Sequence, residues 1–102
     1  VGSISDNRAG CWYSYRASKA ALNMLVQTAS VEYARRAKNV QLVAFHPGTT
    51  DTALSRPFQG NVPTGKLFSA DFVAEQLLSI VKNMTPVGHA LYLDWQGREI
   101  PW

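Results

Sequence analysis

Residues 40–45 of the chain read VQLVAF and are followed at once by His46, Pro47 and Gly48. A short, β-branched and almost continuously apolar run of this kind is typical of a strand buried on both faces of a parallel sheet. The proline and the glycine end the run, because neither continues a strand readily. The stretch therefore predicts one inner strand of a parallel sheet, and such a strand needs helices on both of its faces.

A long helix is expected just upstream of this strand. It begins near Tyr13 or Ser14 and runs to about Arg36, since the stretch is rich in Ala, Leu and Met and contains neither Gly nor Pro. Its apolar residues form two faces, so we expect cover on two sides. One face holds Ala17, Ala21, Met24 and Thr28, and the other holds Leu22, Leu25, Ala29 and Tyr33.

The downstream sequence continues the alternation of strand and helix. Residues 53–68 form an irregular segment with two prolines and two glycines, and a second helix starts after Ser69 as its N-cap. Residues 90–93 are predicted as another strand, and residues 1–4 as the end of an earlier one. This order indicates βαβ units, and three strands alone do not make a stable doubly wound sheet. We predict an α/β fold in which residues 1–102 are the C-terminal part of a single, larger doubly wound domain.

Composition excludes several other classes of protein. With 46% hydrophobic and 17% charged residues among 102, and a net charge of +3, the chain is globular and far from a nucleic-acid binder. No apolar run is long enough for a membrane span, and no targeting signal is visible. The single cysteine, Cys11, excludes an internal disulfide and a cysteine-built zinc site, and His46 and His89 lack a metal-binding spacing. We expect a cytoplasmic protein with no bound metal, no nucleic-acid partner and no membrane partner.

Tyr15 and Lys19 are the residues that point most directly to chemistry. They lie four apart at the start of the predicted helix, which puts the phenol and the ammonium side by side on one face. A free tyrosine ionises near pH ~10, and a nearby cation lowers the pKa of a phenol by favouring the phenolate. A tyrosine paired in this way can exchange a proton with a carbonyl or alcohol oxygen near neutral pH. Tyr–Lys neighbours on helices are also common as plain surface contacts, so the pair by itself leaves both interpretations open.

The surrounding motifs resemble those of the short-chain dehydrogenase/reductase family. The stretch Tyr13-Ser-Tyr15-Arg-Ala-Ser-Lys19-Ala-Ala-Leu-Asn23 resembles the family's active-site helix, whose signature is Tyr-x-x-x-Lys followed by small residues. The run from His46 to Thr52, HPGTTDT, resembles the family's Pro-Gly-x-x-x-Thr segment. Within the family, the start VGSI and the end Asp94-x-x-Gly97-x-x-x-Pro101-Trp102 are similar to the branch of the C-factor and sniffer-type carbonyl reductases.

The resemblance implies a Rossmann-type fold and an NAD- or NADP-dependent reaction that interconverts a small-molecule carbonyl and an alcohol. Tyr15 then corresponds to the catalytic acid/base and Lys19 to its partner, which also holds the nicotinamide ribose. The expected cofactor-binding residues are Tyr15, Lys19, Pro47, Gly48, Thr50 and Thr52. In this scheme the cofactor supplies the hydride chemistry and the protein supplies orientation and the proton.

Some family features are missing from the chain. The glycine-rich turn that receives the dinucleotide pyrophosphate does not occur, so the cofactor-binding N-terminal half of the domain is expected to be absent. The family's catalytic serine normally precedes the glycine that matches Gly2, which places it before Val1. Ser3 is the second choice within the chain, and Ser5 follows it.

Two further expectations concern the surroundings of this site and its partners. Phe58 and Phe68, on the irregular segment after Thr52, are candidates for a lid over an apolar substrate. Family members pair through the long helix, which implies a homodimer or a homotetramer. The alternative function is a non-catalytic signalling or interaction protein that keeps the fold and uses the same helix as its association surface.

Overall fold

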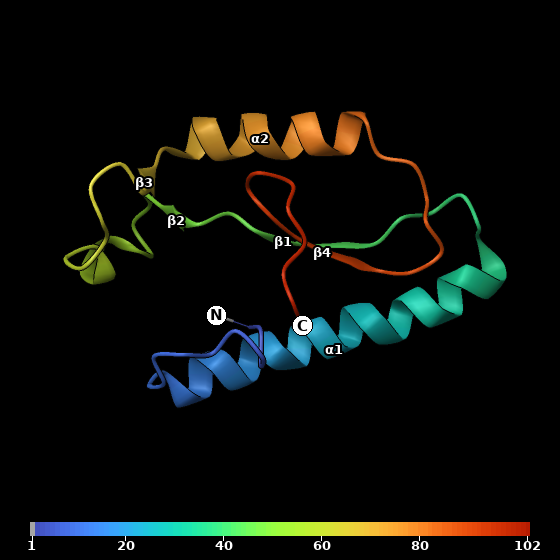
Figure 1. The fold of residues 1–102 in the computed structure, drawn as a ribbon, viewed down its shortest axis with the longest axis horizontal. Coiled ribbons are helices and arrows are strands. Elements are labelled where there is room, and N and C mark those ends of the chain that lie inside the picture. Colours follow the sequence, from blue (N-terminus) through green and yellow to red (C-terminus); the bar gives the residue numbers. More distant parts are fainter. Residues whose placement is uncertain (1) are drawn as a thin grey trace.

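The computed structural model describes residues 2–102 and places two helices on opposite sides of a pair of parallel strands (Figure 1). Strands β1 (Val43–His46) and β4 (Leu91–Asp94) are hydrogen-bonded in parallel, with Val43 opposite Leu91 and His46 opposite Asp94. Helix α1 (Tyr13–Arg36) lies below them in this view, and helix α2 (Ala70–Lys82) lies above them. The predicted layers of helix, parallel sheet and helix are confirmed.

Helix α1 has the predicted bounds but is covered on one side only. It runs for 24 residues, and its last turn carries Arg35 and Arg36, whose charges complement the helix C-terminus. Within the helix only Ser30 is fully buried. The expectation of cover on two sides is not met among residues 2–102, because the sheet lies against one side and nothing in this part of the chain lies against the other. The apolar side chains left exposed are Leu22, Met24, Leu25, Val31 and Tyr33.

Helix α2 follows the predicted start signal. The Ser69 hydroxyl accepts a hydrogen bond from the backbone N–H of Phe72 at 3.1 Å, and Asp71 lies in the first turn, where a negative charge is favourable. The helix ends at Lys82, shortly before Pro86 and Gly88. It connects β1 to β4, as a parallel pair of strands requires.

The two main strands begin later than predicted, and the predicted first strand is not formed. Residues 40–42 lie opposite a loop, and the Gln41 side chain bonds that loop through the carbonyl of His89 and the N–H of Val87. The backbone ladder therefore starts only at Val43. Residues 2–4 make one backbone bond to another segment, from Ile4 N–H to the Trp102 carbonyl at 2.6 Å, and the Ile4 carbonyl then accepts from the N–H of Asn7 in a turn. One bond does not make a strand, so that prediction is wrong for residues 2–4; Val1 lies outside the described residues.

A second, very short parallel pair closes the irregular segment. Strand β2 (Thr49–Thr50) pairs with β3 (Leu67–Phe68), and the N–H of Asp51 donates to the Phe68 carbonyl at 2.7 Å. Between these strands the chain makes an excursion that contains a short 3₁₀ helix, η1 (Arg56–Phe58). The two ends of this excursion are thus held next to each other.

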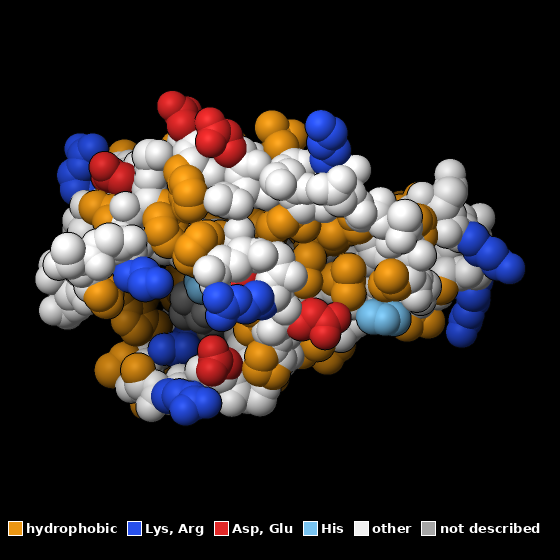
Figure 2. Space-filling view, turned by 45° about the horizontal axis from the view of Figure 1, so that its top comes forward, with side chains coloured by type: hydrophobic (Ala, Val, Ile, Leu, Met, Phe, Trp, Pro, Cys, Tyr) orange, Lys and Arg blue, Asp and Glu red, His pale blue; other side chains and the backbone are white. Residues whose placement is uncertain are grey.

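The buried hydrophobic core is small and centred on β4. Its buried hydrophobic members are Ala90, Tyr92 and Leu93. The tail folds back onto this strand, since the N–H of Ile100 donates to the Tyr92 carbonyl at 2.8 Å. Hydrophobic side chains also reach the surface across the face shown in Figure 2. No helix among residues 2–102 is both long and apolar enough to cross a membrane.

Candidate active site

Tyr15 and Lys19 contact each other on the first turns of α1. The Lys19 ammonium lies over the Tyr15 ring, 5.5 Å from the ring centroid. The spacing of four residues stacks the two side chains on one helix face, as the sequence predicts. Tyr15 is 43% exposed, so an outside molecule can reach it. The geometry therefore provides an accessible phenol beside a positive charge.

Helix α1 starts from an unusual backbone conformation. Gly10, Cys11 and Trp12 have φ angles of 69°, 58° and 61°, and all three lie in the left-handed region. Glycine adopts this region freely, but for other residues it costs roughly 1–2 kcal/mol each. The Arg16 side chain supports the turn, because its Nε donates to the carbonyls of Gly10 at 3.1 Å and Cys11 at 2.8 Å.

An aromatic cluster joins this turn to the irregular segment. The Trp12 ring lies edge-on to the Tyr15 ring at 5.9 Å and to the Phe58 ring at 4.7 Å between centroids. Phe58 belongs to η1, so the excursion after Thr52 reaches the start of α1. Phe68, the other candidate for a lid residue, is not part of this cluster. It packs instead against Phe72 and Trp95 at 5.0 and 4.6 Å.

The predicted cofactor segment, Pro47 to Thr52, follows β1 directly. Gly48 has a φ of 75°, and a Cβ atom built on it would lie 2.8 Å from Cε2 of Phe68. The Thr50 hydroxyl is buried and has no hydrogen-bond partner within the part of the chain that the structure describes. Thr52 is exposed, and its hydroxyl accepts from the N–H of Ser55 at 3.3 Å. The segment thus combines a close-packed glycine with an unpaired buried hydroxyl.

Ser55 is a structural residue that sequence reasoning missed. Its hydroxyl donates to the Thr50 carbonyl and accepts from the N–H of Thr52, and the Gln59 amide donates to it at 3.1 Å. Ser55 therefore ties the end of the Pro47–Thr52 segment to η1. The signal in the sequence was the Thr52-x-x-Ser55 spacing, which is typical of a turn stabilised by hydroxyl groups.

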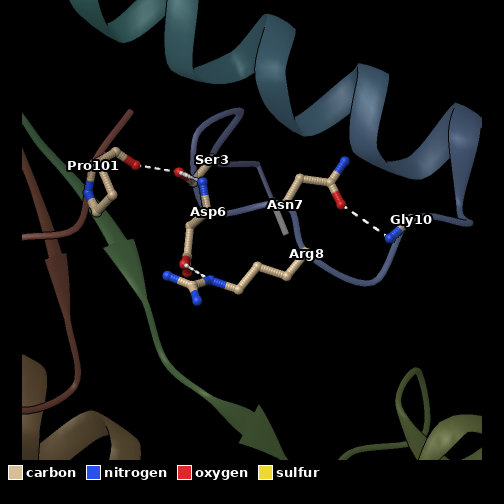
Figure 3. Close-up of polar contacts among 6 residues, drawn as sticks. All are labelled: Ser3, Asp6, Asn7, Arg8, Gly10 and Pro101. Atoms are coloured by element: carbon tan, nitrogen blue, oxygen red, sulfur yellow. Dashed lines mark hydrogen bonds and ion pairs between the residues drawn. The ribbon is translucent and has the colours of Figure 1, made fainter.

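The Ser3 hydroxyl is committed to two backbone groups. It donates to the Pro101 carbonyl and accepts from the N–H of Asp6 at 3.2 Å, and the residue is only 5% exposed (Figure 3). The same loop is held by an ion pair between Arg8 and Asp6, 3.6 Å apart. Ser3 thus links the N-terminal loop to the C-terminal tail.

His46 ends β1 and carries a perturbed pKa. Burial lowers the pKa of its imidazole below the ordinary 6.5, against the opposing effects of the Asp94 and Asp6 carboxylates. Among residues 2–102, no group of three or more His, Cys, Asp or Glu side chains is arranged to hold a metal ion. Burial at the end of β1 thus favours the neutral form of the His46 imidazole.

The lowered pKa predicts how stability depends on pH. At a pH well above 6.5 the imidazole is neutral in both the folded and the unfolded chain. As the pH falls below this value, the unfolded chain takes up the proton more readily, so the free energy of unfolding decreases. Urea denaturation of the full-length protein between pH 7.5 and 5.5 should show this loss, and His46→Gln should reduce it. His89→Gln is the matched control, which leaves the His46 contribution in place; equal pH dependence in the two variants contradicts the assignment.

Comparison with known proteins places these residues in a family. The family model for short chain dehydrogenases matches residues 1–62. The chain is 33% identical over all 102 of its residues to C-signal from Myxococcus xanthus, and spans 56% of that protein. It superimposes on a solved structure of NADPH-bound carbonyl reductase from chicken fatty liver with a TM-score of 0.79 and 31% identity, covering 99% of this chain and 39% of that one.

The structure of the carbonyl reductase Sniffer of D. melanogaster has the same fold, with a TM-score of 0.80 at 23% identity over 99% of this chain and 37% of that one. The predicted α/β, Rossmann-type class is confirmed, and the 102 residues correspond to part of the larger chains that share it. The resemblance read from Tyr15, Lys19 and the HPGTTDT run is confirmed at the level of the family, and the chain belongs to the short-chain dehydrogenases.

Proposed function

We propose that the full-length protein is an NAD- or NADP-dependent oxidoreductase that interconverts a carbonyl and an alcohol by hydride transfer. The observation that carries the proposal is the Lys19 ammonium above the ring of an accessible Tyr15. A phenol beside a cation is suited to give a proton to a carbonyl oxygen and to take it back from an alcohol. Tyr15 is then the general acid/base, and Lys19 is its electrostatic partner.

The residues of the Pro47–Thr52 segment fit a dinucleotide cofactor. Among residues 2–102 the buried Thr50 hydroxyl has no hydrogen-bond partner, and a buried polar atom of this kind is normally satisfied by some ligand or water. Lys19 adds several N–H donors for a ribose diol. Tyr15, Lys19, Pro47, Gly48, Thr50 and Thr52 would hold the nicotinamide end of the cofactor. The cofactor, when bound, supplies or accepts the hydride, and the chicken carbonyl reductase is described as binding NADPH.

The protein's own groups orient the substrate and handle the proton. In the direction of reduction, the Tyr15 hydroxyl donates its proton to the substrate oxygen as that oxygen gains negative charge. The Lys19 charge favours the phenolate that remains. Ser3 is the weaker candidate for the catalytic serine, because its hydroxyl already bonds Pro101 and Asp6. A serine upstream of Val1 is the better candidate.

The proposal also covers the rest of the domain, the location of the protein and its substrate. We propose that residues 1–102 are the C-terminal part of a single domain whose N-terminal part completes the cofactor site; the chain's coverage of about half of C-signal supports this. We place the protein in the cytoplasm, where an exposed lone thiol such as Cys11 stays reduced. Its substrate is a small carbonyl or alcohol.

A hydride-transfer assay tests the proposal. The full-length protein is mixed with NADPH or NADH and a panel of small aldehydes and ketones, and loss of cofactor absorbance is followed. Turnover in the wild-type protein and in Tyr13→Phe, together with its loss in Tyr15→Phe, supports the proposal. Absence of turnover across the panel in both directions, or full activity of Tyr15→Phe, rejects it.

A second candidate function is association through α1, and two observations favour it. Large apolar side chains on the outer face of the helix are exposed, among them Met24 at 67% and Leu25 at 66%. One of the relatives is named C-signal. Exposed apolar patches on a helix commonly mark contact with another protein. We infer that a second copy of the protein covers this face, which gives a homodimer or a homotetramer with or without catalysis.

Charge placed on this face should break the association. We expect Leu25→Glu in the full-length protein to lower the molar mass measured by light scattering to that of a smaller species, because a buried carboxylate at an interface is strongly unfavourable. Ser18→Glu, at an exposed position on the first turns of the same helix, is the control for added charge. If Leu25→Glu loses association but keeps turnover, the two functions are separate; an unchanged molar mass excludes this face as the interface.

A further inference from the structure

The turn before α1 is held in a conformation that proton transfer by Tyr15 does not explain. Cys11 and Trp12 both have left-handed φ angles, 58° and 61°, which side chains other than glycine and asparagine rarely adopt. Such conformations persist only where the surrounding structure holds them, and they cluster at functional sites.

Arg16 holds the turn through its side chain and its backbone. The guanidinium Nε donates to the Gly10 carbonyl at 3.1 Å and to the Cys11 carbonyl at 2.8 Å. The backbone N–H of Arg16 donates to the Trp12 carbonyl at 2.8 Å. All three carbonyls of the turn therefore accept hydrogen bonds from Arg16. Arginine suits this task because its donors lie in one rigid plane, whereas a lysine ammonium is a point on a flexible stem.

The turn places Trp12 between Tyr15 and the excursion after Thr52. The Trp12 ring contacts the Tyr15 ring on one side and the Phe58 ring on the other, at 5.9 and 4.7 Å. Trp12 is nevertheless 47% exposed and Phe58 is 55% exposed. The two rings contact each other edge to face, at an interplanar angle of 68°, and both remain about half exposed. They therefore form an angled apolar surface against which an aromatic ring of a ligand packs favourably.

We propose that Arg16 is a positioning residue that keeps Trp12 and Phe58 as an aromatic wall beside Tyr15, and that this wall selects substrates whose carbonyl carries a planar, apolar substituent. Small aliphatic carbonyl compounds gain little from such a wall. The statement about substrates rests on the proposed function, whereas the statement about the position of Trp12 does not.

The position of Trp12 is tested without any reaction. The full-length protein is labelled with 5-fluorotryptophan, and its ¹⁹F NMR signal for Trp12 is assigned by loss in Trp12→Phe. Arg16→Met should move this signal toward the position of a solvated tryptophan, because the ring leaves its two aromatic neighbours. Arg36→Met, on the exposed last turn of α1, should leave it unchanged.

A rescue experiment distinguishes the loss of the Arg16 hydrogen bonds to the turn from a general loss of structure. Glycine adopts a left-handed φ at no steric cost, so in Cys11→Gly the turn depends less on the hydrogen bonds from Arg16. Adding Cys11→Gly to Arg16→Met should return the Trp12 signal most of the way to its original position. A Trp12 signal that is unmoved by Arg16→Met, or that Cys11→Gly does not restore, overturns the assignment to Arg16.

Kinetics test the substrate statement. Arg16→Met and Trp12→Ala should raise KM for an aryl ketone about tenfold, the effect of losing one good aromatic contact, and Cys11→Gly should restore KM in the Arg16→Met background. For a small aliphatic ketone, which makes little contact with the wall, the same variants should raise KM by much less than tenfold, so the preference for the aryl ketone falls. Equal losses for both ketones contradict the wall. If the wild-type protein turns over neither ketone, the proposed function fails while the ¹⁹F result still decides the role of Arg16.

Discussion

Tyr15→Phe in the full-length protein should lower kcat by about 10³-fold, because general acid–base catalysis contributes about 10²–10⁴ to a rate. The substitution removes one hydroxyl group and keeps the ring that packs against Trp12 and lies under the Lys19 ammonium. The stability of the protein should therefore change little. The loss should appear in kcat, since the proton is transferred only as the carbonyl oxygen gains charge.

Tyr13→Phe is the matched control for this prediction. Tyr13 lies on the first turn of the same helix and is 89% exposed, so it offers the same phenol outside the Tyr15–Lys19 contact. Its kcat should equal that of the wild-type protein. Steady-state rates under saturating cofactor, with the melting temperature as a check on folding, decide the question. A tenfold or smaller effect of Tyr15→Phe means that another group supplies the proton.

Gly48→Ala should be the most destabilising of the glycine substitutions, for two separate reasons. The φ of 75° is costly for alanine by roughly 1–2 kcal/mol. The new methyl group would also lie 2.8 Å from the Phe68 ring. That ring cannot move aside easily, because Phe72 and Trp95 pack against it. Overpacking of this kind costs typically about 1–3 kcal/mol, so we expect a total loss of about 2–5 kcal/mol.

Gly65→Ala separates the two contributions. Gly65 also has a left-handed φ, 80°, but a Cβ atom built there meets no atom within 4 Å. Alanine at this position should cost only the backbone strain, about 1–2 kcal/mol. Urea denaturation of both variants measures the difference, which belongs to the contact with Phe68. Equal losses at the two glycines show that this contact carries no weight.

Local signals predicted the helices well, whereas the strands depended on contacts that the sequence does not reveal. The bounds of α1 follow from an uninterrupted run of good helix formers, and α2 starts where Ser69 offers a cap. Strand bounds are fixed by the partner strand instead. Residues 40–42 continue the predicted strand, yet the Gln41 side chain bonds a loop and the paired register starts at Val43, where the N–H of Leu91 donates to the Leu42 carbonyl. Residues 2–4 meet the tail through the Ser3 hydroxyl and through a single backbone bond at Ile4, which is too little to form a strand.

In the candidate site, too, one part was predictable from local sequence and the other part was not. The Tyr15–Lys19 contact follows from helical spacing alone and is present in the structure. The brace made by Arg16 was not predictable, because Cys11 and Trp12 adopt a conformation against their own preferences. The contact of Trp12 with Phe58 joins residues 46 positions apart, which no local pattern encodes. Helical spacing thus predicts the Tyr15–Lys19 contact, whereas tertiary contacts determine what surrounds it.

The pairing of β2 with β3 has a consequence for how such a protein can diversify. Because Thr49–Thr50 and Leu67–Phe68 are hydrogen-bonded side by side, the intervening residues leave the sheet and return to it at nearly the same place. The entropy of closing a loop rises only slowly with its length, so insertions or deletions there are tolerated without shifting β1 or β4. The excursion, which reaches Tyr15 through Phe58 and Trp12, is therefore a segment whose length and sequence can vary while the Tyr15–Lys19 contact on α1 stays in place.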